Sequence, residues 1–189
     1  MKQNKITVET LLSWNPCCSF DGEKYCEAEL RKKIGDGKTP LEVSRMWSVP
    51  LKDRIWVLLR PEVLGEDNLK SVLDEIADYH VERSCLDCGI TEVEKWAKGW
   101  LGGEDRTSDA AWSAARSAWS AAESATDYAA RSAAEYAAWS AEYAAWSAGW
   151  SAWSAVESAA EYARFAGVGR RKEEKRQLGI IRKYLRRID

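Results

Sequence analysis

One short cysteine motif and a single histidine are the residues of this chain with the clearest capacity for chemistry. Cys85-Leu-Asp-Cys88 has the spacing of a zinc-binding pair, His80 lies upstream of it, and Cys17 or Cys18 could supply a fourth ligand. The chain has no second motif of this kind, and its only histidine falls on a predicted helix. Buried reduced thiols at a helix end are therefore the favoured interpretation. A thiol nucleophile at Cys17 or Cys18 would have only His80 as its base, which disfavours a Cys–His enzyme.

Acidic side chains are plentiful, but they form no recognisable acid–base pair. Glu135 and Glu142 lie seven residues apart on one edge of a predicted helix, and Asp127, Arg131 and Glu135 form a ladder of alternating charge. The simplest interpretation is a solvated helix edge that a partner could contact. The segment Gly102-Gly-Glu-Asp-Arg106 lacks the Lys-Ser/Thr of a phosphate-binding loop and predicts a turn.

Aromatic side chains recur at alternating steps of three and four residues, which places them on one stripe of a helix. The stripe consists of Tyr136, Trp139, Tyr143, Trp146, Trp150 and Trp153. Rings at this spacing usually belong to the core. The alternative is a slot in which the rings stack a flat ligand such as a nucleobase, with Arg116, Arg131 or Arg164 available for its phosphate.

The stripe lies in an alanine-rich tract without proline that runs from Asp105 to Phe165. Its middle is a seven-residue sequence that occurs twice in succession, at Ala134–Ser140 and Ala141–Ser147, a period typical of a helix. Opposite the aromatic stripe lies an alanine seam, small enough for close backbone approach. The seam consists of Ala134, Ala137, Ala141, Ala144, Ala148, Ala152 and Ala155.

A break in this tract is expected, because a single helix of about 60 residues would be roughly 90 Å long, far more than the size of a compact domain. On such a helix Trp112 and Trp119 would fall among the alanines rather than with the stripe. A break between Ser124 and Asp127 reconciles the two sets, with Ser124 or Thr126 capping the second helix.

The rest of the chain predicts short helices and no alternating β pattern. Thr39-Pro40 has the pattern of a helix start, Gly102-Gly103 that of a helix end, and Lys172–Ile188 that of a basic amphipathic closing helix. We expect an all-α multi-helix bundle. A single helical domain over residues 1–189 would comprise short helices in 1–103, the Ala/Trp-rich helices in 104–167 and the closing helix in 168–189.

Composition and charge restrict the function classes. The chain has 11 Trp and 7 Tyr but only 2 Phe, so the aromatic rings must supply much of the burial. The formal net charge is −2, divided between about +6 on residues 170–189 and about −8 elsewhere, which argues against general nucleic-acid binding. We expect no signal peptide, no membrane span, reduced cysteines and a cytoplasmic location in a bacterial host cell.

Three segments in order resemble a known family. These are Leu11-Leu-Ser-Trp-Asn-Pro-Cys17, the segment Val49-Pro-Leu-Lys-Asp-Arg-Ile-Trp-Val-Leu-Leu-Arg60, and the Cys85/Cys88 helix end, followed by the alanine-rich tract. Together they resemble the Ala-rich immunity proteins of bacteria and phages. The resemblance implies neutralisation by binding and carries no catalytic residues. Members of that family have many Arg residues in the tract where this chain has Ser, Tyr and Trp, so the partner surface differs.

These features predict a non-enzymatic binding protein of immunity or phage counter-defence type, which needs no cofactor and blocks a protein toxin or defence effector. Glu135 and Glu142, with the exposed rings of the stripe, are the expected contact surface for a basic partner. The alternative function is a small-molecule binder that sequesters a nucleotide-derived immune signal between Trp and Tyr rings. An alanine seam left uncovered would favour a homo-oligomer.

Overall fold

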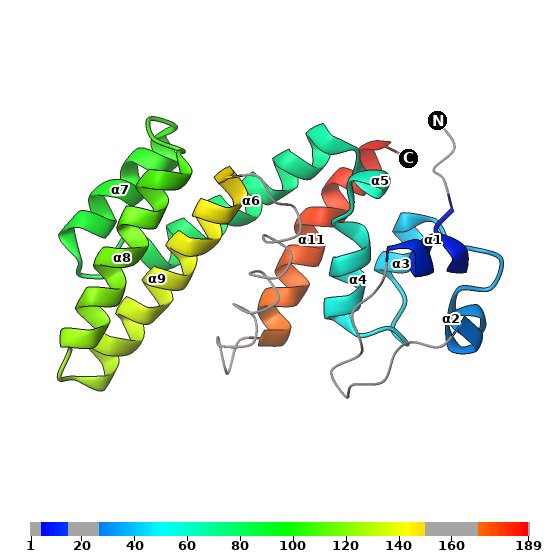
Figure 1. The fold of residues 1–189 in the computed structure, drawn as a ribbon, viewed down its shortest axis with the longest axis horizontal. Helices are drawn as coiled ribbons and strands as arrows, with labels where there is room; N and C mark the ends of the chain where they lie inside the picture. The colour runs from blue at the N-terminus through cyan, green and yellow to red at the C-terminus, as the bar shows by residue number, and fades with distance from the viewer. Residues whose placement is uncertain (1–4, 15–26, 150–169, 189) are drawn as a thin grey trace. The chain divides into compact units, whose positions relative to one another are not determined.

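The computed structural model describes residues 5–14, 27–149 and 170–188 (Figure 1). These residues form ten helices and no strand, which confirms the predicted all-α helical bundle. One isolated antiparallel bridge pairs Ile6 with Lys38. Among the helices described, none combines the length and the apolar character that crossing a membrane requires.

The helices group into two compact units. The first comprises Met1–Glu66 with Glu174–Asp189, and the second comprises Asp67–Glu173. The single-domain organisation expected from the sequence stays a prediction.

The first unit is built from short helices and the C-terminal helix. Its helices are α1 (Val8–Ser13), α2 (Glu27–Ile34), α3 (Pro40–Ser44), α4 (Leu51–Leu58), α5 (Pro61–Leu64) and the greater part of α11 (Arg170–Ile188). As predicted, Thr39 caps α3 and Pro40 follows it, and a reciprocal bond from the Thr39 amide to Glu42 completes a capping box. The closing helix α11 buries Leu178, Ile181 and Leu185, as its amphipathic pattern predicts.

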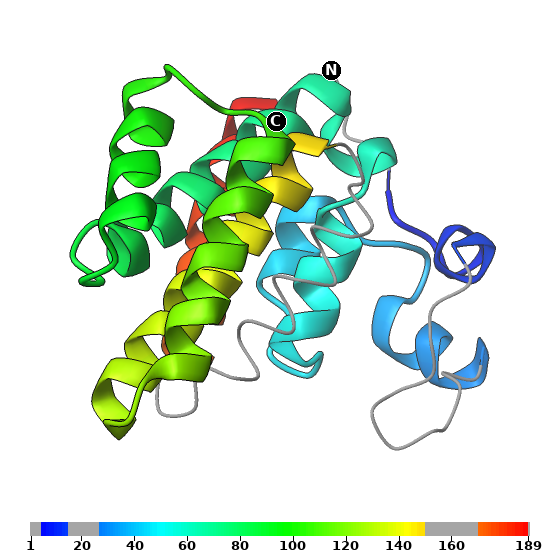
Figure 2. The same ribbon diagram turned by 60° about the vertical axis from the view of Figure 1, so that its left-hand side comes forward.

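Within the described residues, the second unit is built from four helices that follow one another along the chain. They are α6 (Glu66–Cys85), α7 (Thr91–Gly102), α8 (Ser108–Ser124) and α9 (Tyr128–Gly149), and α7, α8 and α9 lie side by side (Figures 1 and 2). Helix α7 ends at the predicted glycines, because Gly103 adopts a left-handed conformation with φ of 78° that other residues rarely tolerate.

The predicted break in the alanine-rich tract is present, and it makes α8 and α9 an antiparallel hairpin. Ser124 is the last residue of α8 and Tyr128 is the first of α9. The predicted caps Ser124 and Thr126 are wrong, because the Asp127 carboxylate accepts a hydrogen bond from the Ala130 amide at 2.9 Å. The Ser124 hydroxyl instead donates to the Ala121 carbonyl of its own helix.

Alanines let α9 approach its neighbours closely. Ala114 and Ala115 of α8 pack with Ala141 of α9 in one buried cluster. Two short side chains reach the backbone of α9: the Ser108 hydroxyl donates to the Ala145 carbonyl at 3.0 Å, and the Cys85 thiol donates to the Ala137 carbonyl at 3.6 Å. Within its described part, the alanine seam is therefore largely covered by the chain itself, since Ala134, Ala137, Ala141 and Ala144 are all buried.

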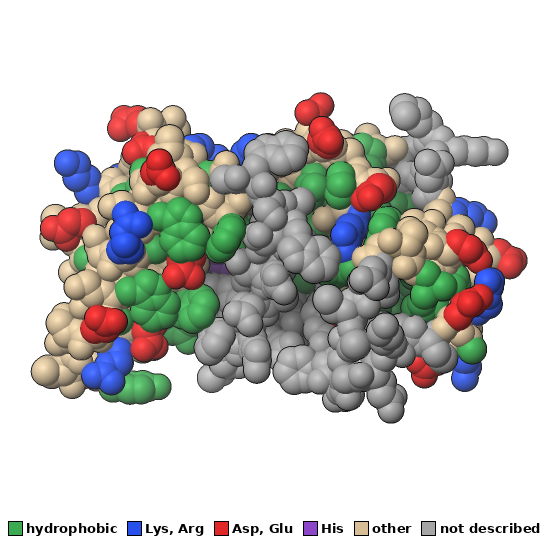
Figure 3. All heavy atoms as spheres, in the orientation of Figure 1, with side chains coloured by type: hydrophobic (Ala, Val, Ile, Leu, Met, Phe, Trp, Pro, Cys, Tyr) green, Lys and Arg blue, Asp and Glu red, His purple; other side chains and the backbone are tan. Residues whose placement is uncertain are grey.

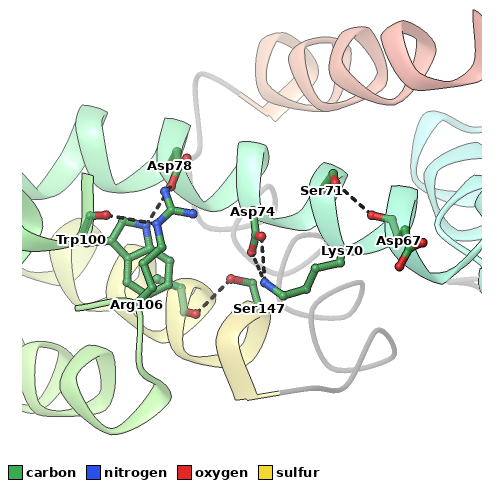
Figure 4. Close-up of polar contacts among 9 residues, drawn as sticks. Asp67, Lys70, Ser71, Asp74, Asp78, Trp100, Arg106 and Ser147 are labelled. Carbon is green, nitrogen blue, oxygen red and sulfur yellow. Dashed lines mark hydrogen bonds and ion pairs between the residues drawn. The ribbon is translucent and has the colours of Figure 1, made fainter. Parts of the chain in front are cut away.

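A polar cluster fixes α7 and the start of α8 on α6 (Figure 4). The Asp78 carboxylate accepts a hydrogen bond from the indole of buried Trp100 at 2.9 Å and a second, charge-assisted bond from Arg106. Arg106 also donates to the Trp100 carbonyl and lies over the Trp100 ring. Trp100 thereby attaches the end of α7 to α6, and Arg106 attaches the segment before α8 to the same carboxylate.

The close packing of the hairpin predicts a strong size dependence at Ala141. We expect Ala141→Leu to lower the free energy of unfolding by about 1–3 kcal/mol, because the added atoms must displace either α8 or α9. Ala133→Leu is the matched control, since Ala133 lies on the exposed side of the same helix and should change stability by less than about 0.5 kcal/mol. Urea unfolding of the two variants measures the difference, and equal losses would contradict the close approach.

Candidate functional site

Two pairs of tryptophans join α8 to α9 on one face of the hairpin. Trp112 meets Trp146 with ring centroids 5.4 Å apart and an interplanar angle of 80°. Trp119 meets Trp139 at the same distance with an angle of 74°. Both are edge-to-face contacts, the favourable geometry for aromatic pairs. We call Trp112, Trp119, Trp139, Trp146 and Glu142 the tryptophan face.

The two pairs follow from the antiparallel register of the hairpin. Trp112 and Trp119 are seven residues apart on α8, and Trp139 and Trp146 are seven apart on α9. Seven residues are close to two helical turns, so each helix presents both of its rings on one side. When the chain reverses direction at the break, the first ring of α8 meets the last of α9 and the two inner rings meet each other.

Glu142 lies between the α9 members of the two pairs, and its environment differs from a solvated edge. Its carboxylate accepts a hydrogen bond from the Trp119 indole across the hairpin, with the nitrogen and oxygen 2.7 Å apart. The side chain is half-buried. The bond fixes one carboxylate oxygen beside the rings, so a negative charge is held in place within an aromatic surface.

The other predicted surface residues on α8 and α9 differ in their exposure. Glu135 is half-buried, whereas Arg116 and Arg131 are exposed. Arg131 donates to the Ala125 carbonyl, which ties the end of α8 to α9 across the break. Figure 3 shows hydrophobic side chains gathered on the surface over α8 and α9, with acidic and basic side chains beside them.

The aromatic stripe of α9 divides between core and surface. Tyr143 is fully buried, so it belongs to the core. Tyr136 and Trp139 are half-buried, and Trp146 remains 37% exposed despite its contact with Trp112. Trp150 and Trp153, and also Arg164, lie outside the described residues. The surface part of the stripe is therefore the part that the hairpin pairs with α8.

The buried core of the second unit contains the only histidine of the chain. His80 is fully buried and makes edge-to-face contacts with Tyr79 and with Tyr143, at centroid distances of 5.4 and 5.2 Å. Burial, with a smaller contribution from the charge of Arg83, lowers the pKa of His80 to about 3. The imidazole is therefore neutral at physiological pH and serves as a packed ring.

Of the two cysteines that suggested zinc, Cys85 is buried and Cys88 is partly buried, and both are free thiols. Burial raises the pKa of the Cys85 thiol well above its ordinary range, and it raises the pKa of Cys88 as well. Among the described residues, no group of three or more His, Cys, Asp and Glu is placed to hold a metal ion. Cys17 and Cys18, the expected fourth ligands, lie outside those residues.

The arrangement as a whole suits recognition of a surface. Partly exposed indoles supply large contact area with little loss of side-chain entropy, and the fixed carboxylate of Glu142 supplies a directional acceptor. The sequence located the rings of α9 and Glu142 but not their partners on α8. The signal that could have found them is the identical seven-residue spacing of the two tryptophan sets.

Comparison with known proteins adds no further information on this site. No family model matches the chain, and neither a curated protein nor a solved structure matches it. The all-α fold and the tryptophan face are therefore the features from which a function can be inferred. The resemblance to immunity proteins stays a prediction.

The neutral state of His80 predicts a loss of stability in acid. Its pKa in the folded protein, about 3, lies below the ordinary value of 6.5, so between these values the unfolded chain binds a proton that the folded protein does not. Folding should lose about 2 kcal/mol from this group between pH 6.5 and pH 5. Urea unfolding at pH 7 and pH 5 should show a smaller acid loss for His80→Gln than for the unchanged chain. An identical acid loss in both proteins would refute the assignment.

Proposed function

We propose that this chain is a non-enzymatic binding protein of immunity or counter-defence type, which neutralises a toxin or defence effector by covering its surface. The observation that supports the proposal most is the tryptophan face itself. It combines two indole pairs with a carboxylate held between them, and Trp and Tyr are the residues that most often dominate binding energy at protein interfaces.

The charge of the face favours a basic partner. Glu142 lies within the face, Glu135 precedes it by seven residues on the same helix, and Glu123 is exposed on α8. Arg116 and Arg131 offset part of this charge, so the face would attract a partner by local complementarity rather than by a strong uniform field.

The alternative function, sequestration of a nucleotide-derived signal between rings, has less support from the geometry of the described rings. In both tryptophan pairs the edge of one ring contacts the face of the other, with centroids 5.4 Å apart. A base stacked between two rings would need them parallel and about 7 Å apart, because stacked aromatic planes lie roughly 3.5 Å from each other. The described pairs would have to open before a base could enter.

Neutralisation of toxic effectors encoded near the gene of this chain tests the proposal. The wild-type chain should restore growth to cells that express one of these effectors, and it should bind that effector directly. A variant carrying Trp146→Ala and Glu135→Lys should bind at least about 30-fold more weakly, as expected for loss of a central anchor and one attractive charge. Biolayer interferometry measures the affinities.

The control variant carries Trp47→Ala and Glu92→Lys, which remove an exposed ring and reverse one exposed charge outside α8 and α9. It should bind as the wild type does. Equal weakening in both variants would contradict the surface assignment, and failure of the wild type to neutralise any effector would contradict the function. Quenching of tryptophan fluorescence by one member of a panel of cyclic and ADP-ribose-type nucleotides would favour the alternative.

A further inference from the structure

The C-terminal end of α3 gathers several arginines around one buried serine. The Ser44 carbonyl accepts hydrogen bonds from Arg54, at 3.0 Å, and from Arg182 of α11. The Ser44 hydroxyl accepts a further bond from Arg182 Nε at 3.1 Å, while donating its own proton to the Leu41 carbonyl. The hydroxyl and the carbonyl of Ser44 thus hold the guanidinium of Arg182, a residue 138 positions away in the sequence, in a fixed orientation.

Part of this guanidinium remains available. An arginine has five N–H donors, and the bonds to Ser44 use two donors of Arg182. The remaining donors have no protein acceptor among the residues that the structure describes. Because the Nε and one terminal nitrogen are fixed, the other terminal nitrogen is held in place before any ligand arrives.

Two further positive charges lie beside Arg182. Arg45 follows Ser44 directly at the end of α3, and Arg186 lies one helical turn beyond Arg182 on α11. Both side chains are exposed, and neither forms an ion pair with a carboxylate in the described parts of the chain. Partial burial and then the charges of Arg45 and Arg186 lower the pKa of Arg182, so each of these two side chains lies close enough to repel the Arg182 guanidinium.

We propose that Arg45, Arg182 and Arg186 form a binding site for a phosphate group. The site gathers three positive charges that a bound anion would bridge. A phosphate monoester carries about −1.5 to −2 charge and three strong acceptor oxygens, whereas a carboxylate carries a single charge and two oxygens. Planar guanidinium groups match phosphate oxygens in pairs of parallel hydrogen bonds, which makes arginine the preferred residue for such a site.

A phosphorylated small molecule fits this site better than a nucleic acid. The tail from residue 170 to 189 has a charge of about +6, but the remainder of the chain has about −8 and would repel an extended polyanion. The site uses residues other than those of the tryptophan face. Failure of phosphate binding therefore leaves the proposed function of that face intact, and the reverse also holds.

Isothermal titration with pyrophosphate, against a sodium chloride reference of equal ionic strength, tests the site. The wild-type chain should bind pyrophosphate, and Arg186→Ala should bind it about tenfold or more weakly, because one charge-assisted contact is lost. Arg45→Ala should weaken binding in the same way. Both side chains are exposed, so the variants should keep the melting temperature of the wild type.

Arg187→Ala is the matched control, because it removes the same charge from the next residue, whose guanidinium lies over the Tyr184 ring. It should retain affinity within about twofold of the wild type. Equal weakening by Arg186→Ala and Arg187→Ala would overturn the site and indicate diffuse attraction to the basic helix. The absence of any heat beyond the chloride reference would overturn it as well. So would stronger binding of a single-stranded oligonucleotide that both variants weaken equally, which would indicate nucleic-acid binding by the helix.

Discussion

The close contact of α8 and α9 through alanine is the constraint on which the tryptophan face depends. Ala114 and Ala115 pack with Ala141, and the hydroxyl of Ser108 and the thiol of Cys85 also reach the backbone of α9. Small side chains contribute little hydrophobic burial, so the contact needs support from other residues. The tryptophan pairs supply it, because they close over the same helices on one side of the alanine contact.

This division of roles connects stability to function. Rings that pair across the hairpin gain contact energy from each other, yet Trp146 remains partly exposed and Glu142 is held by the Trp119 indole. Residues that stabilise the fold therefore also form the surface that a partner would contact. Because the rings already pack against each other, they would lose little entropy on contact with a partner. In the core, the buried ring of Tyr143 packs α9 against His80 of α6.

Local signals in the sequence predicted much of the fold. The cap at Thr39, the end of α7 at Gly103 and the break after Ser124 follow from residues with strong local preferences, and all three are present. Ser124, Thr126 and Asp127 are all polar residues that could cap α9. Which of them does so depends on where the backbone turns, and the residue types alone do not determine that position. Contacts between helices could not be predicted from these local signals either. The pairing of Trp119 with Trp139, and the bonds from Arg182 to Ser44, depend on register and on packing between distant segments.

The register of the hairpin is the central claim, and nuclear Overhauser effects between indole protons measure it directly. Signals are assigned with single Trp→Phe variants of the full chain. The structure predicts cross-peaks between Trp112 and Trp146 and between Trp119 and Trp139, since both pairs have centroids 5.4 Å apart. Cross-peaks between Trp112 and Trp139, or no cross-peak between the two helices, would contradict the register and the tryptophan face built on it.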